Sequence, residues 1–313
     1  MMRSNAAALA ALAVLLAAPV RAQVSLEAAF DAARALRAGA YDAGPSDIAA
    51  PPSRPLLRAP APDETAAPDA FDANDGFRAA LLAPARSDRW LVPTALGTVM
   101  LVVEKGYLSD ARLDRLCADL QEAVSEIPRL TGRHVWTAKR FTVYVYDDGP
   151  LSEADVPGLA AGEKGLMLRF VKDDAEPLFH ELTHMLAGYS KSQSLGEGIA
   201  EWVQARLRPG RAHAFVPAAT DPRTRAKAAL AKWPAAFLTT IGAPGYWFQG
   251  SNRDIRFDFY YSSWSFVDFL MRQGDAKAFW SVADAGGEPD AYLKAYGRGY
   301  DRLIAEWVSE VNR

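Results

Sequence analysis

Five residues, HELTH at positions 180–184, constrain this chain more than any other part of its sequence. We expect them to lie in a helix, because Pro177 is tolerated in a first helical turn and Gly188 can end a helix in a left-handed conformation. Histidines four residues apart in a helix project from one face, so the two imidazoles can share one cation. Glu181 lies on the neighbouring strip, where it can reach a metal-bound water without being a ligand.

The alternative is a pair of packed or solvated histidines on an ordinary helix. Only four histidines occur among the 313 residues, and two of them meet in this one pattern. A chance match is expected on the order of once in a few hundred such chains. We therefore interpret His180 and His184 as metal ligands.

A catalytic metal site of tetrahedral geometry needs a third protein ligand and one open position for water. The candidates follow in SLGEGIAEW at 194–202, where we expect a second helix that is stopped by Pro209 and Gly210. Ser194 and Glu197 also match a capping box, in which the glutamate bonds back to the first amide of its own helix. Glycines flank Glu197 on both sides and allow another helix to approach closely, which a capping box does not require. We therefore favour Glu197 as the third ligand.

HELTH followed by GEGIAEW resembles the gluzincin metallopeptidases, which carry H-E-x-x-H on one helix and a glutamate ligand on the next. The likeness is closest to small bacterial peptidase-like families and extends over residues 95–313. It implies a Zn²⁺ ion held by His180, His184 and Glu197. The metzincin pattern does not fit, because Ser190 stands where its third histidine would fall.

The same resemblance gives Glu201 a role. In thermolysin-like sites an acidic residue one helical turn after the third ligand accepts a hydrogen bond from the first histidine ligand, which is His180 here. A zinc-bound imidazole needs its other N–H held in this way, since the bond fixes the ring and its tautomer. The alternative for Glu201 is an exposed helix carboxylate near Arg206.

The sequence constrains less well the residue that donates a hydrogen bond to the oxyanion, the negatively charged oxygen that forms when water attacks a carbonyl. Aminopeptidase-like gluzincins use a tyrosine well downstream of the third ligand, which shares the negative charge of the oxyanion with zinc. In the similar segment FYYSSWSFVDFL, Tyr260 aligns with that tyrosine and Tyr261 is the near alternative, while aromatics at this spacing also suit a core. Tyr189 is a third, less favoured candidate for this donor. We interpret His134 and His213 as bystanders.

The apolar periodicity predicts an α+β fold, with a small mixed sheet and helices first and a mostly helical half second. Strands are expected at Gly97–Glu104, 141–146 and 165–171, and an amphipathic helix at 113–127 that Pro128 and Gly132 close. Beyond residue 175 every periodic segment is helical. This order is zincin-like and places the HELTH helix at the junction of the two halves.

The first 22 residues are typical of an export signal. Arg3 supplies the positive start, residues 6–20 are apolar, and VRA at 20–22 is a small-x-small cleavage site. The apolar run is too short to span a bilayer comfortably, with an uncleaved anchor as the alternative. We expect no transmembrane span after signal removal, and a periplasmic or secreted location in a bacterium.

Residues 23–87 differ from the rest of the chain. We expect a weak amphipathic helix at 26–36 and then a flexible linker, because the Pro, Ala, Asp and Ser of 44–68 cannot bury enough apolar surface to offset the entropy of ordering. A pro-segment that blocks the active site is the alternative. Residues 88–313 are the expected catalytic domain.

Charge and cysteine content exclude two further features. With 35 basic and 38 acidic residues the chain has no strong basic field, so nucleic acid is not an expected partner. Cys117 is the only cysteine, so no internal disulfide can form.

These observations lead us to expect an exported zinc metallopeptidase, a hydrolase that acts on a peptide or protein. Zinc lowers the pKa of its water, Glu181 takes the proton of that water and passes it to the leaving amine, and Tyr260 helps to stabilise the oxyanion. Two alternatives remain: a zinc amidase that cuts cell-wall material, and a peptidase-like binding protein without turnover. The intact set of ligands and general base favours an enzyme.

Overall fold

The computed structural model describes residues 57–58, 73–83, 85–136, 140–148, 152–159, 163–211, 213, 216, 221–233, 238–244 and 253–313. All of them lie in one compact unit, Pro51–Arg313. The expected export signal and the expected helix at 26–36 lie outside the described residues and stay predictions. None of the described helices is both long enough and apolar enough to cross a membrane.

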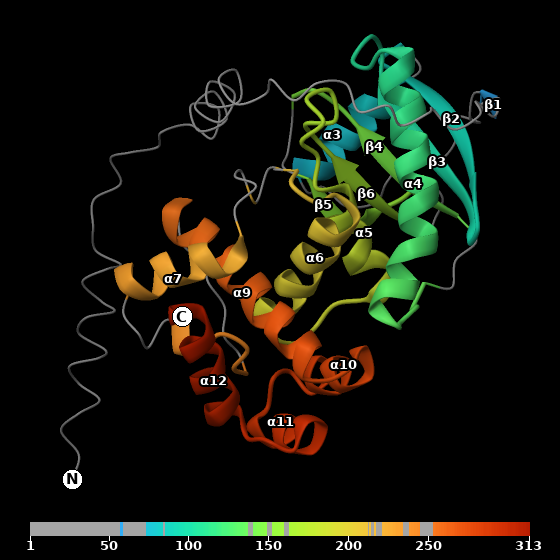
Figure 1. Ribbon diagram of the computed structural model, residues 1–313. Helices are drawn as coiled ribbons and strands as arrows, with labels where there is room; N and C mark the ends of the chain where they lie inside the picture. The colour runs from blue at the N-terminus through green and yellow to red at the C-terminus, as the bar shows by residue number, and fades with distance from the viewer. Residues whose placement is uncertain are drawn as a thin grey trace. The chain divides into compact units, whose positions relative to one another are not determined.

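The predicted α+β class is confirmed (Figure 1). The described strands form one mixed sheet in the order β1-β2-β3-β4-β6-β5, in which β3, β4 and β6 run parallel and the outer pairs run antiparallel. The bounds are β1 (Leu57–Arg58), β2 (Ser87–Thr94), β3 (Gly97–Glu104), β4 (Arg140–Val145), β5 (Glu153–Pro157) and β6 (Lys164–Leu168). Strands β2 and β5 have no counterpart among the predicted strands, because β2 mixes polar residues with a proline and β5 has only five residues.

Apolar side chains lie on both faces of this sheet, because successive residues of a strand point to opposite faces. On β3, Val99, Leu101 and Val103 belong to the large core, while Met100 and Val102 belong to a second, smaller cluster. Strands β4 and β6 alternate in the same way. The sheet therefore needs cover on two sides.

Part of the stretch interpreted as a linker or pro-segment supplies this cover. Helix α3 (Ala73–Leu82) packs on the smaller cluster, where the Phe77 ring meets the Tyr146 ring edge-on with centroids 4.7 Å apart. Strand β1 pairs with β2 at the other end of the sheet order. The composition of 44–68 favours a linker. However, β1 and α3 already belong to the folded layers, and both precede residue 88, where the catalytic domain was expected to begin.

Helix α4 (Asp110–Thr131) shows one difference from its predicted end. Gly132 follows it in the left-handed conformation, with φ 62°, as expected of a residue that closes a helix. Pro128, however, lies inside the helix and does not end it. A proline removes only one backbone donor, and the last turn continues past it to Thr131.

The helix that carries HELTH, α5 (Leu178–Ala187), is buried along its whole length. It contacts α4, β5 and β6 on the side of the sheet and α6 (Gln193–Leu207) on the other side, so it lies at the junction of the two halves as predicted. It begins slightly later than expected, since Pro177 is its N-cap residue and stands outside the first turn.

A buried ion pair anchors the chain just ahead of α5. The guanidinium of Arg112, on α4, donates from Nε to the Val171 carbonyl at 2.6 Å and pairs with the Glu176 carboxylate. Burial raises the pKa of Glu176 to about 7, although Arg112 acts to lower it. The pair joins α4 to the segment that leads into the HELTH helix.

The helical half follows α6 in the chain and gathers around one long helix, α9 (Figure 1). Helix α9 packs against α6 and α7 and contacts α10. The bounds of these helices are α7 (Pro222–Lys232), α9 (Arg253–Gln273), α10 (Ala276–Asp284), α11 (Pro289–Tyr296) and α12 (Tyr300–Asn312).

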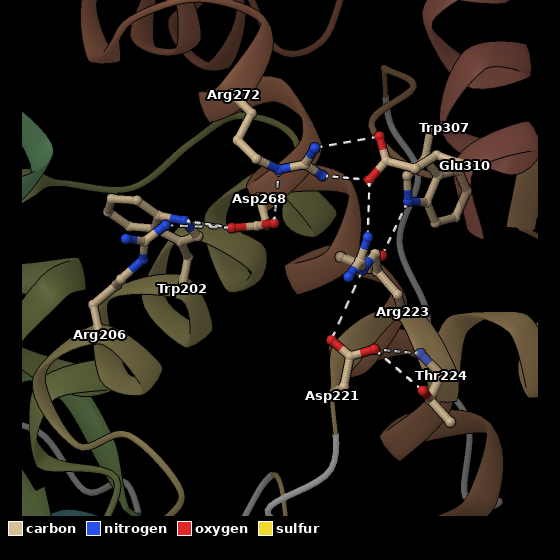
Figure 2. A network of polar contacts seen from close by, with 10 residues as sticks. Trp202, Arg206, Asp221, Arg223, Thr224, Asp268, Arg272, Trp307 and Glu310 are labelled. Carbon is tan, nitrogen blue, oxygen red and sulfur yellow. Dashed lines mark hydrogen bonds and ion pairs between the residues drawn. The ribbon is translucent and has the colours of Figure 1, made fainter. Parts of the chain in front are cut away.

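Ion pairs and hydrogen bonds tie these helices together (Figure 2). The Asp268 carboxylate of α9 accepts a hydrogen bond from Trp202 Nε1 of α6 at 3.2 Å and pairs with Arg272 at 3.1 Å. Arg272 also pairs with Glu310 of α12 at 2.6 Å, and Arg223 of α7 lies 3.6 Å from the same carboxylate. The network holds α6 in place from the side of α9 and α12.

Helices α6 and α9 approach each other closely at Gly198. A Cβ atom at this position would lie 2.5 Å from the Ser263 carbonyl oxygen and 2.6 Å from Val267 Cγ2, so only glycine fits. Gly196 differs, because a Cβ atom there would meet only Ser190, at an ordinary contact distance of 3.6 Å. Of the two glycines that flank Glu197, one therefore allows the helix contact expected from the sequence.

We predict opposite effects for the two Gly→Ala substitutions in α6. Gly198→Ala should lower the free energy of unfolding by about 1–3 kcal/mol, because α9 must move to admit the methyl group. Gly196→Ala, the matched control, should be neutral or raise it by up to about 1 kcal/mol, since alanine favours a helix. Urea denaturation measures both, and equal stability of the two variants would contradict the close approach.

Candidate metal centre

Three side chains from α5 and α6 turn their polar atoms toward one point. His180 Nε2 lies 3.2 Å from His184 Nε2 and 3.2 Å from Glu197 Oε2, and His184 Nε2 lies 3.7 Å from the same oxygen. Both histidines are buried, and the Glu197 side chain is 14% exposed. The three residues form a group that could hold a metal ion.

The spacing suits a small cation of tetrahedral preference. Ligand atoms bound about 2.0–2.1 Å from one zinc ion at the tetrahedral angle lie about 3.3 Å from one another. The three observed distances fall close to that value. Two imidazole nitrogens and one carboxylate oxygen are also a ligand set that zinc accepts. The geometry and the chemistry of the donors therefore both fit zinc.

Local structure explains how Glu197 reaches this point. Helix α6 has Ser192 as its N-cap residue, so Glu197 lies beyond the first turn. Ser194 does not cap the helix either, since its Oγ accepts the backbone N–H of Gly242 at 2.7 Å. The capping box that was the alternative for Glu197 is absent here, and the carboxylate faces the histidines.

A residue that the sequence did not single out holds the other oxygen of Glu197. Gln193 Nε2 donates to Glu197 Oε1 at 2.6 Å, one helical turn before it. This bond leaves Oε2 directed at the histidines. The spacing of four residues in one helix is a signal that could have identified Gln193, because side chains at that spacing are neighbours.

Glu201 lies next to the first histidine, at the offset expected from the sequence. Its Oε1 is 3.0 Å from His180 Nδ1, and the carboxylate is 1% exposed. The exposed position near Arg206 is therefore not the one that it takes. Its Oε2 lies 2.9 Å from Nε2 of His213, which is also buried. His213 was interpreted as a bystander, because nothing in the sequence of the loop after α6 indicates where its ring lies.

The carboxylate of Glu181 lies against the backbone of β5, the last strand in the sheet order. It is buried, and the backbone N–H of Ala154 donates a hydrogen bond to it. Burial raises the pKa of Glu181, and the positive charge that His180 and His184 can carry acts in the opposite direction. The bond to a strand fixes Glu181 beside the two histidines without using it as one of the converging ligands.

Three tyrosines were candidates, and the structure separates them. The Tyr260 ring lies with its centroid 6.1 Å from that of His180, on the site side of α9. Tyr261 is fully buried and stacks on Trp264, and the Arg225 guanidinium lies over its ring, 5.0 Å from the centroid. Tyr189 is 50% exposed and stacks flat on His184, with centroids 4.8 Å apart.

The field in this centre is negative. Burial lowers the pKa of the His180 imidazole, but the carboxylates of Glu201 and Glu197 outweigh it and raise the pKa well above its usual value. Burial raises the pKa of Tyr260 well above its usual value, and the carboxylates of Glu197, Glu201 and Glu181 add to the increase. Such a field attracts a cation, and it keeps the Tyr260 phenol protonated so that it can donate a hydrogen bond.

Comparisons with known proteins do not assign this chain to a family. No protein-family model and no curated protein matches the sequence. Among solved structures, the chain is similar to a mutant two-domain M1 zinc metallopeptidase bound to L-tryptophan, with a TM-score of 0.40 and 12% identity over 70% of this chain and 50% of that one. It is also similar to an M1 zinc metallopeptidase from Deinococcus radiodurans, with a TM-score of 0.38 and 15% identity over 71% of this chain and 52% of that one. The chain thus spans about half the length of the structures it matches, and a likeness of this size does not assign it to their family.

Proposed function

We propose that this chain is a zinc-dependent peptidase with His180, His184 and Glu197 as its metal ligands. The observation that carries the proposal is the convergence of two imidazole nitrogens and one carboxylate oxygen at 3.2, 3.2 and 3.7 Å. Three acceptors, two of them buried, would repel one another at these distances unless a cation or proton lay between them. Three protein ligands leave a fourth position open, as in catalytic zinc sites.

The roles of the protein groups follow from their places around that point. Zinc bound there would supply a Lewis acid that lowers the pKa of water and polarises a carbonyl. Glu181 takes the proton of the attacking water and passes it to the leaving amine nitrogen. The Tyr260 hydroxyl donates a hydrogen bond to the carbonyl oxygen, on which negative charge develops. Glu201 holds the Nδ1–H of His180 and thereby its ring.

A peptide is the substrate that the surroundings of Glu181 favour. Glu181 touches the backbone of β5, and β5 is the last strand in the order of the described sheet. An extended peptide can bind to the open edge of a sheet through its main chain. In that position its amide bonds would pass beside Glu181. Export remains a proposal that rests on the pattern of residues 1–22, and cell fractionation of the full-length protein tests it.

Metal content tests the ligands. Elemental analysis of the purified chain should find about one zinc ion per molecule, as expected of a single three-ligand site. His184→Ala should lose most of it, whereas His134→Ala should retain it, because His134 is exposed and lies outside the group. Circular dichroism checks that both variants are folded. Equal zinc in a folded His184→Ala variant would rule out this site.

The general base is tested by Glu181→Gln. This variant should bind zinc as the wild type does and lose about 10²–10⁴-fold in kcat, because an amide cannot accept the proton of the water. Cleavage of a mixed peptide library and of peptidoglycan, with and without chelator, measures the activity and separates a peptidase from a cell-wall amidase. Full activity in Glu181→Gln would refute this role.

The donor to the carbonyl oxygen is tested by three Tyr→Phe substitutions. Tyr260→Phe should lower kcat by about 10²–10³-fold with little change in zinc content, since it removes one hydrogen-bond donor. Tyr261→Phe should stay close to wild type, because Tyr261 lies in the core. If Tyr189→Phe loses activity and Tyr260→Phe does not, the donor is Tyr189.

A further inference from the structure

One buried carboxylate joins two imidazole rings in the described structure. Glu201 lies with Oε1 3.0 Å from His180 Nδ1 and Oε2 2.9 Å from His213 Nε2. All three side chains are at most 3% exposed. The ring centroids of the two histidines are 6.2 Å apart, so Glu201 spans the space between them.

The positions of the protons follow from the acceptors. An ionised carboxylate only accepts hydrogen bonds, so each ring nitrogen that faces Glu201 can bond to it only when that nitrogen carries a hydrogen. With Nδ1 of His180 protonated, its Nε2 presents a lone pair to the convergent point.

His213 is held where it can make this contact. Its backbone N–H donates to the Val216 carbonyl at 3.0 Å, and the Val216 N–H donates back to the His213 carbonyl at 3.2 Å. Both residues follow the end of α6 at Leu207 in the sequence. The backbone of His213 is therefore held by its two hydrogen bonds to Val216, while Glu201 lies on helix α6.

We propose that His213 is a positioning residue of the metal centre, which acts on His180 through Glu201. The proposal rests on the zinc site proposed above. Without the hydrogen bond from His213, Oε2 of Glu201 would be buried with one donor fewer, and the carboxylate would turn to regain one. Turning it would misdirect Oε1 and release the ring of His180. His213 would thereby set the affinity of the site without touching the metal.

Zinc affinity of the full-length chain tests this role. Competition with a chromophoric chelator should give a zinc dissociation constant for His213→Leu that is about 10–100-fold larger than that of the wild type. This is the usual effect of losing a residue that hydrogen-bonds to a metal ligand from outside the coordination sphere. His213→Gln should recover most of the loss, because its amide can donate a hydrogen bond to Glu201. His134→Leu is the matched control and should bind as wild type does, since His134 is exposed.

A double-mutant cycle separates the proposed role from a loss of packing. In a Glu201→Ala background, His213→Leu should weaken zinc binding less than about twofold further, because the pathway is already broken. An effect as large as in the wild-type background overturns the proposal, and so does failure of Gln to rescue. Tight zinc binding in His213→Leu overturns the role of His213 and leaves the metal site standing. Absence of zinc binding in the wild type overturns both.

Discussion

The structure depends on one constraint, the burial of ionisable side chains on a helix with no exposed face. Every residue of α5 is buried, including His180, Glu181 and His184. Polar groups in such a place need partners, because leaving them without any costs several kcal/mol. The partners come from both sides: β5 supplies a backbone N–H to Glu181, and α6 supplies carboxylates to the histidines. The sheet half and the helical half thus meet at the polar atoms of one helix.

Helix α6 supplies its polar partners from one strip of side chains. Gln193, Glu197 and Glu201 follow one another at intervals of four residues, so they share a face of the helix. The first holds the second, the second faces both histidines, and the third holds a histidine ring. On a different face of the same helix, Gly198 lies against α9.

Much of this could be predicted from the sequence, because local spacing determines it. The intervals between His180 and His184 and between Glu197 and Glu201 each place two side chains on one helical face. The class of the fold follows from strands with apolar periodicity ahead of helices. Strand β5 was missed, since its five residues alternate too briefly to be read, and the cover of the second sheet face by α3 was missed because its neighbourhood is rich in proline and alanine.

What the sequence could not provide were contacts between distant segments. His213 reaches Glu201 from a loop, and no period or motif in that loop indicates the direction of its ring. The choice between Tyr260 and Tyr261 is of the same kind. Adjacent residues in a helix point about 100° apart, so only the packing of α9 decides which one faces the site.

The neighbouring positions of Gly198 and Glu197 have a consequence for how variants of this protein would be classified. A side chain at Gly198 would clash with α9, and a shift or turn of α6 about its axis is one way to relieve the clash. A turn moves all three residues of the strip together, away from both histidines. A variant that alters nothing but helix packing would then disrupt the proposed metal site, and in an activity assay it would look like damage to the chemistry itself.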